Sequence, residues 1–297
     1  MFDLHFHSLA SDGKATLEEI VQAAAAQPGL RALALTDHDH ITSSIAFAAL
    51  EPRAWIGAEI FSKHGSMPVD LLALNVRADH DELNHYLSLR TAERRRRFDE
   101  YGERLRADGW IFDPAAEVYA NPQLARPHVV EEIRRHESNQ IRLEEMGIQS
   151  SKPTPVAGQG HDDRIYPLLI DKLDVKGFVY STTDTIALIH RAGGLAVLAH
   201  PFIKPYGKGK ASKSSARRLL REMVVAGLDG IEAFHHSQDE AFRAEVLAQA
   251  TELDLLVTAG SDDHEPGLPY LGSMLAIDHP DAPYYWAQLE EAKNRYR

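Results

Sequence analysis

The chain has 297 residues, of which 44% are hydrophobic and 26% are charged, and it carries a formal net charge of −12 and no cysteine. This composition is typical of a globular protein with one large domain, or with one domain and an insertion. The absence of cysteine excludes disulfides and thiol catalysis, so any metal must be bound by His, Asp or Glu, and the negative charge disfavours long nucleic acid as a partner.

No apolar run in the sequence is long enough to span a bilayer, and the first residues do not combine a basic segment with an apolar core. We therefore expect a cytoplasmic protein with no membrane partner. The sequence leaves the oligomeric state open.

The first strand is predicted over residues 2–7, where apolar and polar residues alternate. Residues two apart on a strand point to the same face, so His5 and His7 project together. Asp12 follows in a turn-forming Ser-Asp-Gly segment. Imidazole and carboxylate groups suit Zn, Mn or Fe, which makes these three residues half of a candidate metal site. The alternative interpretation is a pair of polar residues on an exposed strand.

Three further short strands are predicted in the first quarter of the chain, over residues 31–36, 55–60 and 69–74. The first runs directly into four consecutive ionisable residues at 37–40, the second ends on Glu59, and the third has Asp70 as its only charge. Helices are predicted between strands, one starting at a capping box on Thr16 and one near residues 43–50.

The pattern changes at about residue 76. Residues 79–109 are a charged helical stretch with four consecutive arginines at 94–97. We interpret these arginines as a solvated, ion-paired face rather than a nucleic-acid surface, because acidic residues lie at helical pairing distance. Pro127 then stands at a favourable first-turn position of another helix. We expect residues 76–178 to form a mainly helical insertion that covers the active site, flanked by the two parts of one domain at 1–75 and 179–297.

The alternation of strands and helices resumes after residue 179. Three more strands are predicted, over residues 195–199, 230–234 and 255–259. Strands that alternate with helices favour a parallel sheet, and polar residues gathered after the strands favour a barrel whose active site lies at their carboxyl ends. We therefore predict an α/β fold, a TIM-like (β/α)7 barrel with the helical segment inserted after the fourth strand.

Ten ionisable residues lie at or near the ends of the predicted strands: His5, His7, Asp12, Asp37, His38, Glu59, Asp70, His200, Asp262 and His264. Any one of them, taken alone, is more often a loop cap than a metal ligand. A barrel would bring all of them within reach of one point, where carboxylates packed together without a cation would cost stability. The joint pattern therefore predicts a metal cluster.

The chain resembles the PHP (polymerase and histidinol phosphatase) superfamily. The motifs that carry the resemblance are DLHFHSLASDGK at 3–14, LTDHD at 35–39, GAEI at 57–60, LAHP at 198–201, DGIEAF at 229–234 and GSDDH at 260–264. Their order and spacing fit across nearly the whole chain. RPH at 126–128 further resembles members that act on nucleotide phosphates, among them nucleoside 3',5'-bisphosphate phosphatases and exonuclease-like members. The resemblance implies a distorted (β/α)7 barrel.

The resemblance also implies two or three divalent metal ions, with Mn, Fe or Zn as candidates. The first ion would be bound by His5, His7, Glu59 and Asp262. The second would share Glu59 and add His200 and Asp70, and the third would be bound by Asp12, His38 and His264. Asp70 stands where relatives commonly carry His. A carboxylate there is a harder ligand, which favours Mn or Fe over Zn or else weakens the second site.

Two further carboxylates, Asp37 and Asp39, flank His38 in the sequence. We expect them to orient His38 and neighbouring metal ligands, because hydrogen-bonded carboxylates commonly fix the rings of ligating histidines. The alternative is that either is only a turn residue.

The candidate metal ligands and the resemblance together predict metal-dependent hydrolysis of a phosphate monoester. The substrate would be small and nucleotide-like, such as a nucleoside 3',5'-bisphosphate or a short oligonucleotide. A hydroxide bridging the metals, held by ligands that include Asp262 and His200, would attack the phosphorus in line. One alternative is a cyclic phosphodiesterase or a sugar-phosphate phosphatase. Another is a non-catalytic, metal-stabilised domain that serves a partner.

Phosphate recognition requires groups outside the cluster. Arg126 is the leading candidate because a guanidinium binds phosphate through two parallel hydrogen bonds, and His128 is expected to assist it. His236 and Ser237 resemble a His-Ser pair that contacts phosphate in relatives. Lys204 belongs to a Lys- and Gly-rich loop that could close over an anionic substrate, with a solvated loop as the alternative. An ordinary surface residue is the alternative for Arg126.

Overall fold

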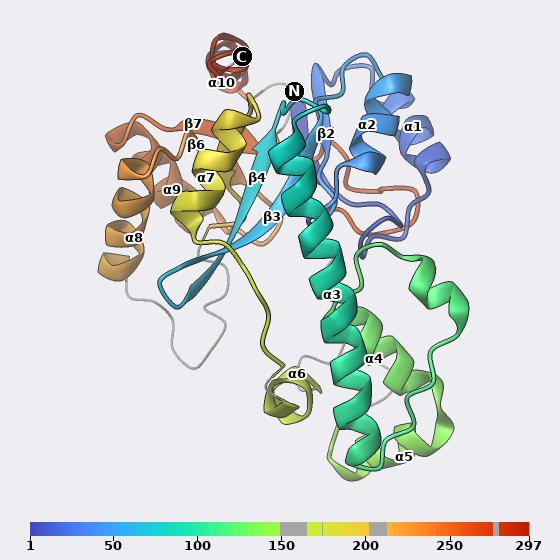
Figure 1. Cartoon of the computed structure of the whole chain (residues 1–297). Coiled ribbons are helices and arrows are strands. Elements are labelled where there is room, and N and C mark those ends of the chain that lie inside the picture. Colours follow the sequence, from blue (N-terminus) through green and yellow to red (C-terminus); the bar gives the residue numbers. More distant parts are fainter. Residues whose placement is uncertain (149–164, 174, 202–212, 276–278, 297) are drawn as a thin grey trace.

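The structure is a computed structural model, and it describes residues 1–148, 165–173, 175–201, 213–275 and 279–296 (Figure 1). The described strands are β1 (Phe2–Phe6), β2 (Ala32–Leu35), β3 (Gly57–His64), β4 (Met67–Leu74), β5 (Leu195–Leu198), β6 (Gly230–Phe234) and β7 (Leu256–Ala259). The α-helices are α1 (Leu17–Ala25), α2 (Thr42–Leu50), α3 (Asp81–Ala107), α4 (Arg126–Arg135), α5 (Glu137–Glu145), α6 (Ile165–Leu168), α7 (Thr182–Arg191), α8 (Lys213–Val225), α9 (Glu240–Glu252) and α10 (Ala282–Ala292). Short 3-10 helices cover Ala116–Ala120 and Ile170–Leu173.

The strands form two sheets. β1 and β2 pair in parallel, and the other five strands follow the order β3-β4-β5-β6-β7. Isolated parallel bridges join the two sheets at both seams, between Phe6 and Asp263 at one and between His38 and Glu59 at the other. The fold is therefore α/β, with its two sheets held together by single bridges rather than by continuous ladders.

The prediction of parallel strands throughout is wrong for β3 and β4. These strands form an antiparallel hairpin, and β4 is also antiparallel to β5. Only two residues separate the paired ends His64 and Met67, and a connection this short can join only antiparallel neighbours. Gly65 provides the turn with a φ of +61°, a conformation that costs glycine little. Glu59 and Asp70 consequently lie inside strands and not at strand ends.

The main hydrophobic core lies between the sheets and the surrounding helices, with fully buried residues such as Leu4, Leu72 and Ile231. A second cluster, which includes Phe6 and Phe47, packs beneath α1 and α2. Thr16 caps α1 as expected, since its hydroxyl accepts from Glu19 N while the Glu19 carboxylate accepts from Thr16 N. These contacts hold the loops that follow β1 and β2 in fixed positions.

The chain between β4 and β5 is mainly helical in its described part, as the sequence predicts. α3 runs away from the strands and carries α4, α5 and α6 at its far end (Figure 1). These helices have a hydrophobic cluster of their own, which includes Phe98, Tyr101, Trp110, Phe112 and Ile133. Among the described helices, none has both the length and the apolar character needed to cross a bilayer.

Candidate metal centre

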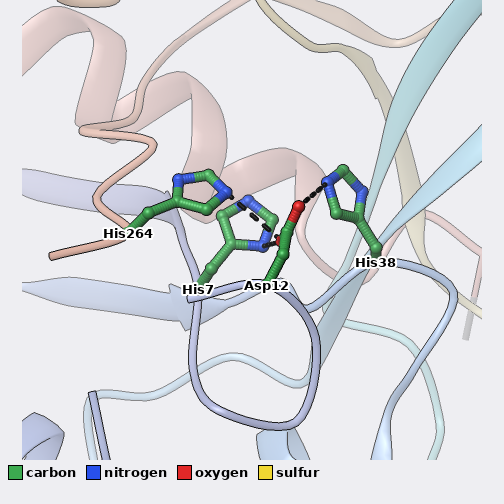
Figure 2. Close-up of side chains that lie close together, drawn as sticks. All are labelled: His7, Asp12, His38 and His264. Atoms are coloured by element: carbon green, nitrogen blue, oxygen red, sulfur yellow. Dashed lines mark ion pairs between the residues drawn. The ribbon is translucent and has the colours of Figure 1, made fainter. Parts of the chain in front are cut away.

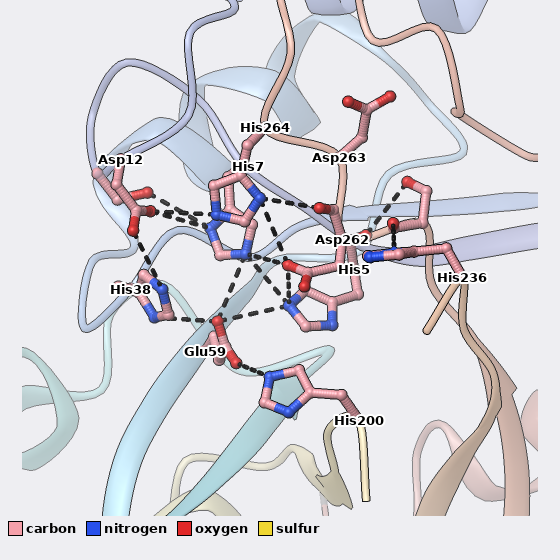
Figure 3. A network of polar contacts seen from close by, with 12 residues as sticks. His5, His7, Asp12, His38, Glu59, His200, His236, Asp262, Asp263 and His264 are labelled. Atoms are coloured by element: carbon pink, nitrogen blue, oxygen red, sulfur yellow. Dashed lines mark hydrogen bonds and ion pairs between the residues drawn. The ribbon is translucent and has the colours of Figure 1, made fainter. Parts of the chain in front are cut away.

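Two histidines and two carboxylates converge on one buried point (Figure 3). His5 lies in β1 and His7 directly follows it on the same face. Their Nε2 atoms are 3.2 Å apart. Glu59 Oε2 lies 3.4 Å from both Nε2 atoms. Asp262 Oδ1, which follows β7, lies 3.4 Å from His5 Nε2 and 3.2 Å from His7 Nε2. These four side chains meet because β1 adjoins β7.

A second group consists of His7, Asp12, His38 and His264 (Figure 2). Asp12 is at its middle, with Oδ1 lying 3.4 Å from His264 Nε2 and Oδ2 lying 3.6 Å from His38 Nε2. The rings of His7 and His264 stack with centroids 4.2 Å apart. The turn after β1 therefore folds back over the strand and points its carboxylate at three imidazoles.

Glu59 connects these groups to a third one, which contains Asp70 and His200. Its Oε2 lies 2.9 Å from His38 Nδ1, and its Oε1 lies 2.9 Å from His200 Nε2. Asp70 Oδ2 is 4.0 Å from the same His200 nitrogen. All nine predicted metal ligands are thus gathered in one network around Glu59.

The donor set fits divalent cations. The candidate ligand atoms lie within 4.8 Å of one another in the second and third groups, and likewise for His5, His7 and Glu59 of the first. Three buried atoms of the network, Asp12 Oδ1, His38 Nδ1 and Glu59 Oε2, make ion-pair contacts within the network but no hydrogen bond of good geometry among the described residues. Buried polar atoms are nearly always satisfied, so these atoms point to cations as their partners. Imidazole and carboxylate donors are compatible with Mn, Fe or Zn.

Neighbouring charges strongly shift the pKa values of the residues in this centre. Burial raises the pKa of Glu59, but the adjacent imidazoles of His38 and His5 outweigh burial and hold that pKa well below its ordinary value. Burial lowers the pKa of His38, but the charges of Glu59 and Asp12 prevail and raise it to about 10. Burial and the charge of Glu59 raise the pKa of Asp70 to about 6. The centre is therefore a place where opposite charges stabilise each other out of water.

Three of the six non-glycine residues with left-handed φ in the described part of the chain lie at or beside the centre. Asp39, His200 and Asp262 adopt left-handed φ values of 48°, 25° and 51°. Non-glycine residues seldom adopt these values, and such strain persists only where the surroundings enforce it. Two of the three residues are members of the network, and the third directly follows His38.

Two residues of the centre were missed by the sequence analysis. Glu232, inside β6, places Oε1 3.0 Å from His5 Nδ1, and its Oε2 accepts a hydrogen bond from His200 N at 2.7 Å. His235, just after β6, places Nε2 3.2 Å from Asp262 Oδ2 and Nδ1 2.7 Å from Ser237 Oγ. A signal was present, because Glu232 is the only charge in an apolar strand, as Asp70 is in its own.

The expected role of Asp37 in orienting His38 and neighbouring ligands stays a prediction, and its contacts lie on the side of His7 and Asp12. The Asp37 carboxylate accepts hydrogen bonds from Ser8 N and Oγ, Ser11 Oγ and Ser43 Oγ at 2.5–2.8 Å. These contacts tie down the loop that leads to Asp12. Ser11 Oγ also lies 3.4 Å from His7 Nδ1, so Asp37 reaches a candidate metal ligand through Ser11.

The expected role of Asp39 in orienting His38 stays a prediction, and the structure adds two arginine partners for its carboxylate. The Asp39 carboxylate pairs with Arg90 and Arg94 of α3. Arg94 is therefore buried in an ion pair and does not belong to a solvated face. Arg96 does match the prediction, because it is exposed and pairs with Glu93 and Glu100.

The predicted phosphate-binding residues lie in different surroundings. The ring nitrogen His128 Nε2 lies 3.2 Å from Asn121 Nδ2, which also donates to Ser11 O next to Asp12. His236 Nδ1 lies 3.1 Å from Ser261 O, next to Asp262. Ser237 contacts His235 as described above. His236 and Ser237 therefore adjoin the centre, and His128 is linked through Asn121 to the loop that carries Asp12.

Arg126 and Lys204 do not have such contacts. Arg126 is the first residue of α4, and it pairs with Asp171 and lies over the Tyr166 ring at 5.6 Å. These contacts belong to the helical segment and not to the centre. Lys204 lies outside the described residues.

Comparisons with known proteins agree with this geometry. The PHP domain model matches residues 3–110. A 3',5'-nucleoside bisphosphate phosphatase of Chromobacterium violaceum is 30% identical, covering 89% of this chain and 87% of that protein. A 5'-3' exoribonuclease of Haemophilus influenzae is 28% identical over 89% of this chain and 90% of that protein.

Two further similarities extend the comparison. A phosphoribosyl 1,2-cyclic phosphate 1,2-diphosphodiesterase of Eggerthella lenta is 29% identical, covering 88% of this chain and 93% of that protein. Among solved structures, an amidohydrolase from Chromobacterium violaceum with bound sulfate and no metal aligns with a TM-score of 0.71 and 26% identity. That alignment covers 97% of this chain and 96% of the other.

Proposed function

The chain belongs to the PHP domain family of metal-dependent phosphoesterases, and on this premise we propose that it removes a phosphate from a small nucleotide-like substrate, such as a nucleoside 3',5'-bisphosphate or a short oligonucleotide. It is a hydrolase of phosphate esters. The observation that carries the proposal is the gathering of nine His, Asp and Glu side chains around Glu59. The identity with the bisphosphate phosphatase of Chromobacterium violaceum supports the choice of substrate.

The three groups would hold two or three divalent ions. His5, His7, Glu59 and Asp262 would bind one, Glu59, Asp70 and His200 a second, and Asp12, His38 and His264 a third. When bound, such ions lower the pKa of a coordinated water and offset negative charge on a phosphoryl oxygen. The carboxylate of Asp70 favours Mn or Fe over Zn at the second position.

The chain's own residues orient these ligands. Glu232 engages His5 Nδ1, which leaves His5 Nε2 directed at Glu59 and Asp262. His235 engages Asp262 Oδ2 and thereby leaves Oδ1 facing His5 and His7. A ring whose remote nitrogen is hydrogen-bonded has a fixed tautomer and direction. Glu232 and His235 are therefore positioning residues of the centre.

Substrate phosphate would be bound beside the centre by His128, His236 and Ser237, with Arg126 and Lys204 contributing cationic groups. His128 is linked through Asn121 to the loop that carries Asp12. Arg126 would exchange its partner Asp171 for a phosphate, to which a guanidinium can donate two parallel hydrogen bonds.

We also propose a barrel architecture with a helical insertion. The seven strands would form a distorted (β/α)7 barrel from residues 1–75 and 179–297, and residues 76–178 would be a helical insertion that covers the active site. The bridges at both seams between the sheets support the barrel. The separate hydrophobic cluster that includes Phe98 and Ile133 supports the insertion. The cytoplasmic location stays a prediction.

The test is a substrate panel assayed with added Mn2+. It would contain adenosine 3',5'-bisphosphate, a 5'-phosphorylated trinucleotide, a phosphoribosyl 1,2-cyclic phosphate and a sugar phosphate. The proposal expects release of inorganic phosphate or nucleotide from the first two at the highest kcat/KM. Preference for the cyclic ester or the sugar phosphate would support the alternative that the Eggerthella lenta relative suggests. Metal-loaded protein that hydrolyses none of the four would indicate a non-catalytic domain.

A further inference from the structure

Asp39 lies at the junction between the centre and the helical segment. It directly follows His38, and its backbone is left-handed with a φ of 48°. The Asp39 N–H donates to Glu59 O over 2.7 Å, and an isolated parallel bridge joins His38 to Glu59. The backbone at Asp39 therefore connects two residues of the candidate metal centre to each other.

The Asp39 carboxylate is held by two arginines of α3. Arg94 donates from Nε and Nη2 to Asp39 Oδ2 over 2.9 and 2.7 Å, and Arg90 Nη2 donates to the same oxygen over 3.1 Å. The Asp39 side chain is 0% exposed, and those of Arg90 and Arg94 are 3% and 12% exposed. Residues four apart on a helix face the same side, so α3 presents both guanidinium groups to one carboxylate.

Gln123 closes the same junction from the other side. Its Nε2 donates to Asp39 O over 3.3 Å and to Thr91 Oγ1 over 2.6 Å. Gln123 is fully buried. The carboxylate and the carbonyl of Asp39 are thus both bound by residues that lie between β4 and β5 in the sequence, whereas its N–H is bound by β3.

From this arrangement we propose that Arg90 and Arg94 act through Asp39 as positioning residues, which set the placement of His38 against Glu59 and thereby the metal affinity of the centre. The proposal rests on the proposed function only in treating the centre as a metal site. Its physical basis is that a buried carboxylate is strongly coupled to its charged partners, and the loss of one partner leaves the other charge unpaired. The loop that holds His38 then loses its side-chain anchor on α3.

The same ion pairs would also dock α3 against the strands, and this purely structural role is the alternative. The two roles predict different results. Docking alone would lower the stability of the fold and leave the metal affinity of folded protein unchanged. Positioning weakens metal binding in variants that still fold.

The experiment is an EPR titration of Mn2+ into the metal-stripped full-length chain. We expect Arg94→Met and Asp39→Asn each to raise the Kd for Mn2+ about 10- to 100-fold, the range found for residues that support metal ligands. In the Mn2+-loaded enzyme, kcat would fall without a matching rise in KM. The matched control is Arg96→Met on the same helix, where the arginine is exposed and pairs with Glu93 and Glu100. This control would bind Mn2+ within about twofold of the unaltered protein.

Arg94→Met or Asp39→Asn protein that melts cooperatively and binds Mn2+ as tightly as the unaltered chain would overturn the proposal. If Arg94→Met does not fold, Arg94→Lys carries the test, because an ammonium keeps the charge but loses the planar pair of donors. A severalfold weaker Kd is expected there, and an unchanged Kd overturns the proposal. Mn2+ binding is measured without substrate, so a failure of the proposed phosphatase activity is seen separately.

Discussion

Glu232 Oε1 lies 3.0 Å from His5 Nδ1, although the two residues are separated by 227 positions in the chain. Both side chains are fully buried. The second carboxylate oxygen of Glu232 accepts from His200 N, so one side chain holds two residues of the candidate metal centre. Burial raises the pKa of Glu232, but the charges of His5 and His235 outweigh burial and lower it, so the group is a carboxylate at neutral pH.

The first prediction concerns this carboxylate. Glu232→Gln replaces one carboxylate oxygen with an NH2 group, which cannot accept a hydrogen bond from His200 N. We expect kcat/KM to fall about 10- to 100-fold, with a similar loss of Mn2+ affinity. Steady-state kinetics and metal titration would measure both. The control is Glu240→Gln, at the exposed first turn of α9. Equal, small effects of the two substitutions would contradict a positioning role for Glu232.

The second prediction separates the centre from substrate binding. Asp262→Ala removes a carboxylate that faces both His5 and His7, and we expect no measurable turnover. Arg126→Ala should raise KM roughly tenfold with little change in kcat, as expected when uniform binding energy is lost. Arg135→Ala, at the other end of α4, is the matched arginine control. Mild and similar effects of Asp262→Ala and Arg126→Ala would argue against both assignments.

The third prediction concerns the metals themselves. Elemental analysis of protein from cells grown with added Mn is expected to find about two or three divalent ions per chain. Removal of these ions with EDTA should abolish activity. It should also lower Tm, because a ligand that binds only the folded state stabilises it. No bound metal after such growth would refute the metal centre.

The Asp70 position provides a fourth prediction. Asp70 is 4.0 Å from His200 Nε2, and its carboxylate is a hard ligand. Asp70→His should shift the activating metal of stripped protein from Mn or Fe toward Zn. Assays of both proteins with each metal in turn would measure this shift. An unchanged order of metals would show that Asp70 does not contribute to metal choice.

The fifth prediction is a pH dependence of the metal-free protein. The charges of Asp12 and Asp262 overcome burial and raise the pKa of His264 to about 9, and contacts with Glu59 do the same for His200. The folded state therefore binds protons more tightly than the unfolded state, whose imidazoles titrate near 6.5. This stabilisation is complete below about pH 6.5 and is lost as the pH rises through about 9.

Thermal melts of EDTA-treated protein would measure this effect. Tm should fall between about pH 7 and pH 9.5, and Mn2+ affinity should rise over the same range, because protons compete with the metal for imidazole nitrogens. Mn2+-loaded protein serves as the control, with a smaller dependence of Tm on pH. A metal-free Tm that rises with pH would contradict the charge distribution of the centre.

Much of the centre could be predicted from the sequence, because the patterns that reveal its residues span only a few neighbouring positions. Alternation in β1 directs His5 and His7 to one face, and short motifs after the other strands carry Asp12, His38, His200 and Asp262. The capping box on α1 and the long helix α3 were predictable for the same reason, since capping and helical spacing involve residues three or four apart. The direction of β4 was not predicted, because the strands were expected at 55–60 and 69–74, and the residues left between them hid the two-residue Gly65-Ser66 turn.

The sequence by itself therefore determined most of the candidate metal ligands and the α/β character of this protein. Only the tertiary structure decided which charges meet, as when Glu232 reaches His5, Asp37 holds the loop before Asp12, and Asp39 pairs with Arg90 and Arg94. The physical reason is that a buried charge must find a partner, but any opposite charge brought near by the fold satisfies it. Local patterns reveal that such a partner is needed, and the packing of distant segments determines its identity.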